Sequence, residues 1–369
     1  MHLRKSCPPA TALLLALASC SSLQPGVPFG PEGEAASRYE LVNAAGMRAV
    51  FTDLGATLVS LEVPSPAGPV DLVLGFDDAA GYRGEGNQYF GCTVGRVANR
   101  IGNSRFLLGG SDEAAVDGAW VLVDANDGPH SLHGGPDGAH LKLWEASGGG
   151  QTLRFRRLFP DGEGGYPGNL QVEVAYTLTD DNALEIQYEA TTDATTVVNL
   201  THHSYFNLAA AGAPTVLDHV LTLDAERYTV AGEGLIPTGE IALVEGSPLD
   251  FREPQALGAR IAALDGTPAI GYDHNFVLRG GEGPAARLVH PDSGRWLEVF
   301  TSEPGLQLYS GNFLFGQEGK DGQVYRHRSA VCLETQHFPD APNHPEFPSI
   351  RLEPGETYRS TCVYAFGGF

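Results

Sequence analysis

Short segments with the two-residue period of a β-strand recur along this chain, and they limit its fold more than any other feature. In segment 170–179, Val172, Val174 and Tyr176 alternate with polar or small residues. This period places one face of a strand in a core and the other toward solvent. Similar runs occupy segments 48–53, 57–63, 184–191, 216–223, 296–301 and 330–335. We expect strands in all of them.

The segments between these runs carry turn residues, and no long amphipathic helical pattern separates them. The 369 residues include 47 glycines and 25 prolines, which favour frequent turns. A hydrophobic fraction of 42% supplies a substantial core. The sequence therefore predicts one all-β domain over residues 38–369, folded as a large antiparallel β-sandwich.

The N-terminus has the pattern of a targeting segment. Arg4 and Lys5 precede an apolar run at 10–18, which is shorter than the ~20 residues that span a bilayer. The run leads into Leu-Ala-Ser before Cys20, which resembles the lipobox of bacterial lipoproteins. We therefore expect residues 1–19 to be a lipoprotein signal peptide, Cys20 to be lipidated, and residues 20–37 to form a flexible tether. This predicts a membrane-anchored protein of the periplasm or cell envelope, with an ordinary cleaved signal peptide as the alternative.

The charge of the chain limits its partners. Its net charge is −22, and removal of residues 1–19, which hold Arg4 and Lys5 but no acid, would make it −24. Such a surface repels nucleic acids and anionic membranes. We expect no nucleic-acid partner, and membrane attachment through the N-terminal lipid alone.

Three cysteines remain outside the N-terminal segment. Cys92, Cys332 and Cys362 each lie in an apolar, strand-like context, which is typical of buried free thiols. One disulfide among them stays open from the sequence. The Cys and His spacings do not match a zinc site, and no motif calls for a cofactor.

Two adjacent histidines, His202 and His203, lie in the sequence Asn-Leu-Thr-His-His-Ser-Tyr-Phe-Asn-Leu at residues 199–208. The run before them is β-prone. Adjacent residues of a strand point to opposite faces, so only one of the two can face a given cleft. A histidine there could transfer a proton near neutral pH. It could equally be an ordinary hydrogen-bonded residue at a strand end, and spacing alone leaves both readings open.

Further motifs place polar groups in apolar or glycine-rich frames. They are Gly-Arg-Val-Ala-Asn-Arg-Ile (95–101), Ser-Leu-His-Gly-Gly (131–135), Gly-Tyr-Pro-Gly (165–168), Tyr-Asp-His-Asn-Phe (272–276), Gly-Leu-Gln-Leu-Tyr-Ser-Gly-Asn (305–312), Cys-Leu-Glu-Thr-Gln (332–336) and Pro-Asp-Ala-Pro-Asn (339–343). In this order, and with the histidine segment, they resemble the aldose 1-epimerase (galactose mutarotase) family. The resemblance implies the galactose-mutarotase supersandwich fold. It also implies an isomerase of carbohydrate metabolism that interconverts the α and β anomers of free aldoses such as glucose and galactose.

The resemblance also assigns the chemistry. Mutarotation needs a base at the anomeric hydroxyl and an acid at the ring oxygen. The family pattern identifies Glu334 as the base and His203 as the acid, with neither metal nor cofactor. We expect a nearby carboxylate to raise the pKa of His203 and keep it protonated.

Five more residues match family positions that contact the sugar. The resemblance implies contacts from Asn99, Arg100, His133, Asp273 and Gln307. The glycines after His133 allow close approach of the backbone to a ligand, and the Arg100 guanidinium offers several donors to sugar hydroxyls.

Two features depart from the family pattern. His202 stands where the family commonly has asparagine. Because alternation turns it away from His203, we expect support rather than chemistry. Segment 124–131 keeps only part of the sequence that usually precedes the His133 loop in the family. This departure affects the expected shape of the sugar pocket and not the expected acid/base pair.

Two other functions stay open. A non-catalytic sugar-binding lipoprotein on the same scaffold would keep Arg100 and Asp273 but could lose the acid or the base. This chain retains both Glu334 and His203, which argues against that alternative. A glycoside hydrolase would use Glu334 and Asp273 as its carboxylate pair. Pure sugar anomers and an aryl glycoside as substrates would separate these functions.

Overall fold

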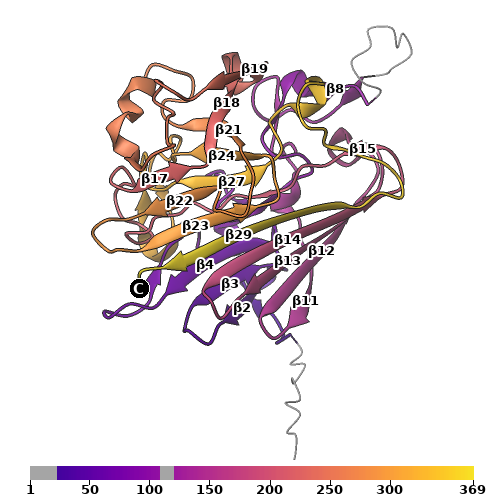
Figure 1. Ribbon diagram of the computed structural model, residues 1–369. Helices are drawn as coiled ribbons and strands as arrows, with labels where there is room; N and C mark the ends of the chain where they lie inside the picture. Colours follow the sequence, from indigo (N-terminus) through magenta and orange to yellow (C-terminus); the bar gives the residue numbers. More distant parts are fainter. Residues whose placement is uncertain (1–22, 109–119) are drawn as a thin grey trace, which may run out of the picture.

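The computed structural model describes residues 23–108 and 120–369. Its largest element is a nine-stranded sheet in which β12, β13, β14, β29 and β23 run side by side (Figure 1). In spatial order the strands are β11 (Glu145–Gly149), β12 (Thr152–Phe159), β13 (Leu170–Leu178), β14 (Ala183–Thr192), β29 (Tyr358–Gly367), β23 (Trp296–Thr301), β22 (Ala286–Val289), β17 (Val220–Leu223) and β20 (Gln255–Ala256). All pairs in this sheet are antiparallel.

Two five-stranded antiparallel sheets accompany it. The first consists of β1 (Val27–Pro28), β2 (Ser37–Val42), β3 (Arg48–Thr52), β4 (Thr57–Val63) and β5 (Val70–Asp71). The second has the order β19 (Pro237–Leu243), β18 (Ala225–Ala231), β21 (Asp273–Leu278), β24 (Gly305–Tyr309) and β27 (Cys332–Gln336), and it lies above the large sheet in Figure 1.

Short strand pairs, one α-helix and eight short 3-10 helices complete the fold of the described residues. The 3-10 helices are Gly102–Ser104, Ala139–Leu141, Glu163–Gly165, Glu233–Leu235, Leu257–Ala259, Ile261–Leu264, Lys320–Gly322 and Ala341–Asn343. The pairs are β7 (Arg100–Ile101) with β10 (Ser131–Leu132), β6 (Thr93–Val94) with β16 (Thr201–His202), β8 (Arg105–Phe106) with β9 (Val121–Leu122), β15 (Thr196–Val197) with β28 (Arg351–Leu352), and β25 (Gln317–Glu318) with β26 (Val324–Tyr325). The helix, α1 (Ala79–Arg83), begins after Asp78, whose carboxylate accepts the amide hydrogens of Ala80 and Gly81.

The core lies between the large sheet and the two smaller ones. On one side the ring of Phe51 in β3 lies 4.7 Å from that of Tyr176 in β13. On the other, the Tyr364 hydroxyl of β29 donates to the carbonyl oxygen of Leu333 in β27. Side chains from all three sheets form one continuous buried cluster. The predicted all-β antiparallel sandwich is confirmed.

Most predicted strands occur where the alternation placed them. Segments 57–63 and 296–301 match β4 and β23, and segment 170–179 ends one residue early. Segment 216–223 is strand only from Val220, because the His219 amide turns back to the Val216 carbonyl. Segment 330–335 becomes β27 two residues later than predicted.

The expected tether needs correction. Residues 1–22, with Cys20, lie outside the described residues, but residues 23–37 pack onto the domain instead of forming a flexible tether. Strand β1 pairs with β2, and the Leu23 amide bonds to the Gly148 carbonyl. Phe29 is buried, with its ring 5.9 Å from Tyr82 of α1. The Phe29 side chain thus anchors segment 23–37, for which the proline and glycine content predicted a flexible spacer.

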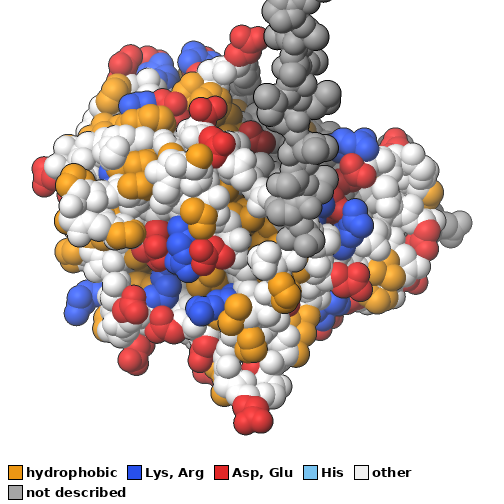
Figure 2. Space-filling view, turned by 90° about the horizontal axis from the view of Figure 1, so that it is seen from below, with side chains coloured by type: hydrophobic (Ala, Val, Ile, Leu, Met, Phe, Trp, Pro, Cys, Tyr) orange, Lys and Arg blue, Asp and Glu red, His pale blue; other side chains and the backbone are white. Residues whose placement is uncertain are grey.

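Cys92, Cys332 and Cys362 are free and buried, as their apolar contexts predicted. Within residues 23–108 and 120–369, no helix has the length and apolar character needed to cross a membrane. On the face in Figure 2, lysine and arginine side chains are scattered among acidic ones and do not gather into a basic patch.

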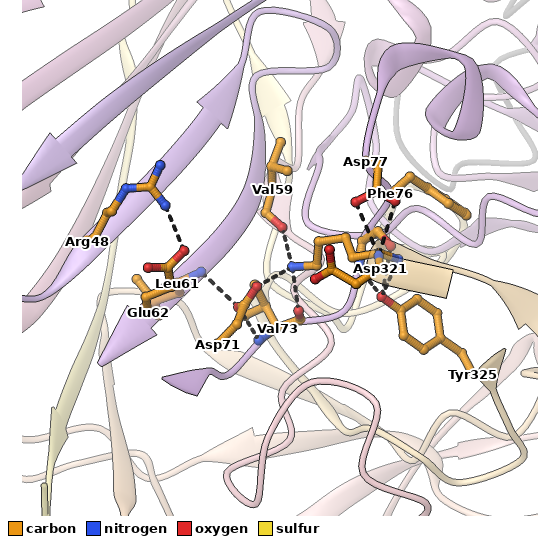
Figure 3. A network of polar contacts seen from close by, with 12 residues as sticks. Arg48, Val59, Leu61, Glu62, Asp71, Val73, Phe76, Asp77, Asp321 and Tyr325 are labelled. Carbon is orange, nitrogen blue, oxygen red and sulfur yellow. Dashed lines mark hydrogen bonds and ion pairs between the residues drawn. The ribbon is translucent and has the colours of Figure 1, made fainter. Parts of the chain in front are cut away.

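A buried lysine, Lys320, ties the connection between β24 and β27 to the first five-stranded sheet. Figure 3 labels its partners Val59, Asp71 and Val73, which lie close together. The Lys320 ammonium donates to the Val59 and Val73 carbonyls at 2.7 and 2.8 Å and to Asp71 at 2.6 Å. Asp71 also accepts the amide hydrogen of Leu61. Because all three donors of the ammonium are used, the charge is compensated where it is buried.

We expect Lys320→Met to lower the free energy of unfolding by about 3 kcal/mol or more, because it leaves the Asp71 carboxylate without its buried partner. The matched control is Arg48→Met, which breaks ion pairs with Glu40 and Glu62 at the surface and should cost less than about 1 kcal/mol. Chemical denaturation measures both. Equal unfolding midpoints for the two variants would contradict the role given to Lys320.

Candidate active site

Three neighbouring strands align three of the predicted site residues. In the register of β21, β24 and β27, Gln307 lies opposite Asn275 on one side and opposite Glu334 on the other. Residues directly opposite in a sheet share a face, so Gln307 and Glu334 point the same way. The Gln307 amide donates to the Asp273 carboxylate at 2.6 Å. One sheet thus gathers two carboxyl groups and an amide.

A short strand pair brings two further site residues together. In the pair of β7 and β10, Arg100 lies opposite Leu132. His133 follows Leu132 directly, so it lies close to Arg100. Asn99 joins them, because its carbonyl accepts the His133 amide hydrogen at 2.9 Å and its own amide donates to His133 Nδ1 at 3.1 Å. Asn99 and His133 have φ values of 58° and 53°, an uncommon region for residues other than glycine.

The pair of β6 and β16 positions His203. The His203 amide donates to the Cys92 carbonyl at 3.0 Å, and its carbonyl accepts from the Gly91 amide at 2.9 Å. His203 Nε2 lies 3.6 Å from Glu334 Oε1, and the His133 and His203 ring centroids are 5.2 Å apart. Elements far apart in sequence therefore bring one carboxyl group and two imidazoles together.

The two adjacent histidines meet different neighbours, as strand alternation predicts. His202 Nε2 lies 2.7 Å from the Ser204 hydroxyl, and its ring packs 5.7 Å from Tyr176 of the large sheet. His203 faces Glu334 instead. His202 is thus a buried supporting residue.

Burial dominates the electrostatics of the Glu334–His203 pair. Their side chains are 2% and 5% exposed. Burial raises the pKa of Glu334 well above its usual value, the nearby Asp273 raises it further, and Arg100 opposes the shift. Burial lowers the pKa of His203 to about 3, so the expected rise caused by the carboxylate is wrong. Both shifts favour the uncharged forms of the two groups.

The other site residues respond to the same burial. Burial raises the pKa of Asp273, against the effects of Arg100 and of the Gln307 hydrogen bond. Burial, followed by the proximity of His203, lowers the pKa of His133 well below its usual value. The imidazoles are therefore neutral at physiological pH, and each carries one N–H donor.

Several buried polar atoms at the site have no hydrogen-bond partner among the described residues. They include Glu334 Oε2, His203 Nδ1 and Gln307 Oε1. Buried polar groups usually have partners. These atoms therefore indicate a site for a ligand with several hydroxyl groups.

His133, His203 and Glu334 form a group of side chains that could in principle ligate a metal, since their donor atoms all lie within 4.8 Å of one another. The hydrogen bonding favours another use. His133 Nδ1 accepts the Asn99 amide hydrogen, so its other ring nitrogen carries the proton and is a donor rather than a metal ligand. The group is suited to donate to and accept from a polyol.

Sequence reasoning missed several residues at the site. Arg100 Nε donates to Asp127 at 2.7 Å, which anchors the guanidinium. The ring of Tyr89 packs against those of His133, His140 and His203. The sequence did carry signs that these residues lie near the site. Tyr89 precedes the 95–101 motif by only a few residues, and His140 follows His133 at the end of the same loop.

The segment before the His133 loop also has a clear task, although it keeps only part of the family pattern. The Asn126 side chain forms two hydrogen bonds with the backbone of Leu132. It accepts the Leu132 amide hydrogen at 2.7 Å and donates to the Leu132 carbonyl at 3.0 Å. The departure thus leaves the support of this loop in place.

Comparisons with known proteins identify the family of the chain. The sequence profile of the aldose 1-epimerase family matches residues 37–365. Galactose mutarotase from Bos taurus is 45% identical over 324 residues, covering 87% of this chain and 91% of its own. Aldose 1-epimerase from Escherichia coli K12 is 37% identical over 346 residues, covering 92% and 97%.

Solved structures show the same architecture. A GalM/aldose epimerase homologue from C. elegans superposes with a TM-score of 0.81 at 33% identity, covering 90% of this chain and 99% of that one. Galactose 1-epimerase from Lactobacillus acidophilus gives a TM-score of 0.77 at 28% identity, covering 94% and 99%. With its sheets, its buried Glu334–His203 pair and its near-complete match to the family profile, the chain belongs to the aldose 1-epimerase family.

Proposed function

We propose that this protein is an isomerase that interconverts the α and β anomers of free aldoses such as glucose and galactose. The observation that carries the proposal is the buried contact between Glu334 and His203, 3.6 Å apart. A base and an acid this close can act on the two oxygens bonded to one anomeric carbon.

The chemistry follows from one proton shared by the pair. With Glu334 ionised and His203 protonated, Glu334 takes the proton of the anomeric hydroxyl and His203 protonates the ring oxygen. The bond between the anomeric carbon and the ring oxygen breaks, and the anomeric oxygen becomes a carbonyl. After rotation about the neighbouring carbon–carbon bond, the two residues reverse their roles and the ring closes on the other face.

Each half-reaction converts one form of the pair into the other. Ring opening leaves Glu334 protonated and His203 neutral, which are the forms that burial favours. Ring closure restores the charged forms. The pair therefore returns to its starting state without an external proton donor, and the site can stay buried throughout turnover.

The remaining predicted residues would hold the sugar. We assign Arg100, Asp273 and Gln307 to the sugar hydroxyls, and Asn99 and His133 to the region near the ring oxygen. Asp273 and Asp127 are more exposed than Glu334 and His203, so the ligand would enter from their side.

Anchoring through Cys20 is a separate proposal. The Leu-Ala-Ser-Cys sequence supports cleavage after Ser19, lipidation of Cys20 and attachment of the catalytic domain to a membrane of the cell envelope. Because Leu23 already bonds to Gly148, only a few residues would separate the lipid from the domain.

Polarimetry with pure α-glucose and α-galactose tests the function and the pair. We expect His203→Gln and Glu334→Gln each to lower the catalysed rate roughly 10²-fold or more, and the double variant to be little worse, because acid and base act as a unit. His202→Asn should change the rate only mildly. An inactive His202→Asn beside an active His203→Gln would contradict the assignment. Cleavage of an aryl glycoside would favour a hydrolase, and sugar binding without turnover a binding protein.

The sugar contacts have their own test. Asp273→Asn and Arg100→Ala should weaken sugar binding and turnover while circular dichroism shows an intact fold. Each lost hydrogen bond to a charged group should cost about 1.5–3 kcal/mol. Unchanged kinetics in both folded variants would remove these residues from the site.

Lipidation is tested by mass spectrometry and membrane fractionation of the full chain. The mature protein should begin at a lipid-modified Cys20 and sediment with membranes, and Cys20→Ser should block processing or release it. An unmodified Cys20 in a soluble mature protein would contradict the anchor.

A further inference from the structure

Tyr89 contacts three imidazole rings at the site. Its ring centroid lies 4.5 Å from His133, 4.7 Å from His140 and 5.9 Å from His203. The planes of Tyr89 and His203 are inclined by only 28°, in a stacked arrangement, whereas the other two pairs are inclined by 58° and 63°. The Tyr89 ring therefore lies nearly parallel to the His203 ring, within about 6 Å of it.

The loop that carries Tyr89 also holds the His203 backbone. The Tyr89 carbonyl accepts the Cys92 amide hydrogen at 3.3 Å, and the Cys92 carbonyl accepts that of His203 at 3.0 Å. The Tyr205 hydroxyl donates to the Gln88 carbonyl at 2.8 Å. Tyr89 has a φ of 62°, which a bulky residue adopts only where its surroundings impose it. The position of the ring relative to His203 is thus fixed.

The Tyr89 hydroxyl is hydrogen-bonded to the segment that precedes the His133 loop. It accepts a hydrogen bond from the Asn126 amide at 3.3 Å, and Asn126 brackets Leu132 next to His133. Burial raises the pKa of Tyr89 to about 12, so the phenol stays neutral. A neutral phenol keeps an electron-rich ring face.

We infer that Tyr89 is a positioning residue of the reaction, whose ring face stabilises the positive charge of His203 when that residue acts as the acid. An imidazolium over an aromatic face is attracted by the ring quadrupole, and more strongly where water is excluded. The contact offsets part of the free-energy cost that burial imposes on the charged form of His203. This role rests on the proposed anomer interconversion.

Tyr89 is not the only residue that contacts the His203 ring among the described residues. Tyr205 stacks on its ring at 5.1 Å, Tyr309 lies edge-on at 6.3 Å, and Glu334 supplies the opposite charge. Tyr205 and Tyr309 are buried in the core. Tyr89 is only half-buried, so its ring can be altered with less effect on the fold.

The test varies the electronic character of the ring at constant shape. Wild type, Tyr89→Phe, a variant with pentafluorophenylalanine at this position, and Tyr89→Leu are compared by polarimetry at saturating sugar. Fluorination reverses the ring quadrupole but keeps the packing. We expect Tyr89→Phe to retain most of kcat, and the fluorinated variant to lose roughly two- to fivefold in kcat relative to Tyr89→Phe with little change in KM. Tyr89→Leu should lose at least as much.

The same aromatic exchanges at Tyr39 are the matched control. Tyr39 is also half-buried and packs edge-on against Phe155 at 6.0 Å, so its fluorination should leave kcat unchanged. Equal kcat for the phenylalanine and pentafluorophenylalanine variants at position 89 would overturn the inference, even if Tyr89→Leu fails to fold. So would a loss in Tyr89→Phe as large as that in Tyr89→Leu. A wild-type protein without mutarotase activity would instead refute the proposed function.

Discussion

The buried contact between the Glu334 carboxyl group and the His203 imidazole is the constraint around which the site is organised. Burial disfavours charge on both groups, yet the proposed mechanism of ring opening needs them charged. One shared proton meets both conditions, because the neutral and charged forms of the pair interconvert as the sugar opens and closes. The neighbouring Asp273 raises the pKa of Glu334 and Arg100 lowers it, so these two charges act on the pair in opposite directions.

The sandwich makes this contact possible. Glu334 lies on β27, the last strand of its sheet, while His203 follows a short strand held by loop 88–92, and a continuous core fixes the two elements relative to each other. The connection between β24 and β27 is anchored through Lys320 to the first sheet. The position of the site residues is therefore set by paired strands and by the Lys320 hydrogen bonds, with aromatic rings filling the space around His203.

The sequence predicted the sandwich because alternation with period two is a local property, clear in segments such as 57–63. It predicted Glu334, His203 and the sugar contacts through resemblance to a family, and the structure brings them together. It did not predict the pKa of His203, which depends on burial by residues far away in the chain. Tyr89, Asp127 and the packing of Phe29 were missed because each acts through a tertiary contact. The position of Tyr89 close to the 95–101 motif does not specify that contact.

Isotope-edited infrared spectroscopy of the Glu334 carboxyl group reports directly which member of the pair holds the proton. In the sugar-free protein at neutral pH, we expect the carbonyl band of a protonated carboxylic acid that is absent in Glu334→Gln, because burial favours the protonated form of this residue. The band should weaken when a cyclic sugar binds and the proton is redistributed. An ionised Glu334 in the sugar-free protein would refute the sharing of one proton by Glu334 and His203.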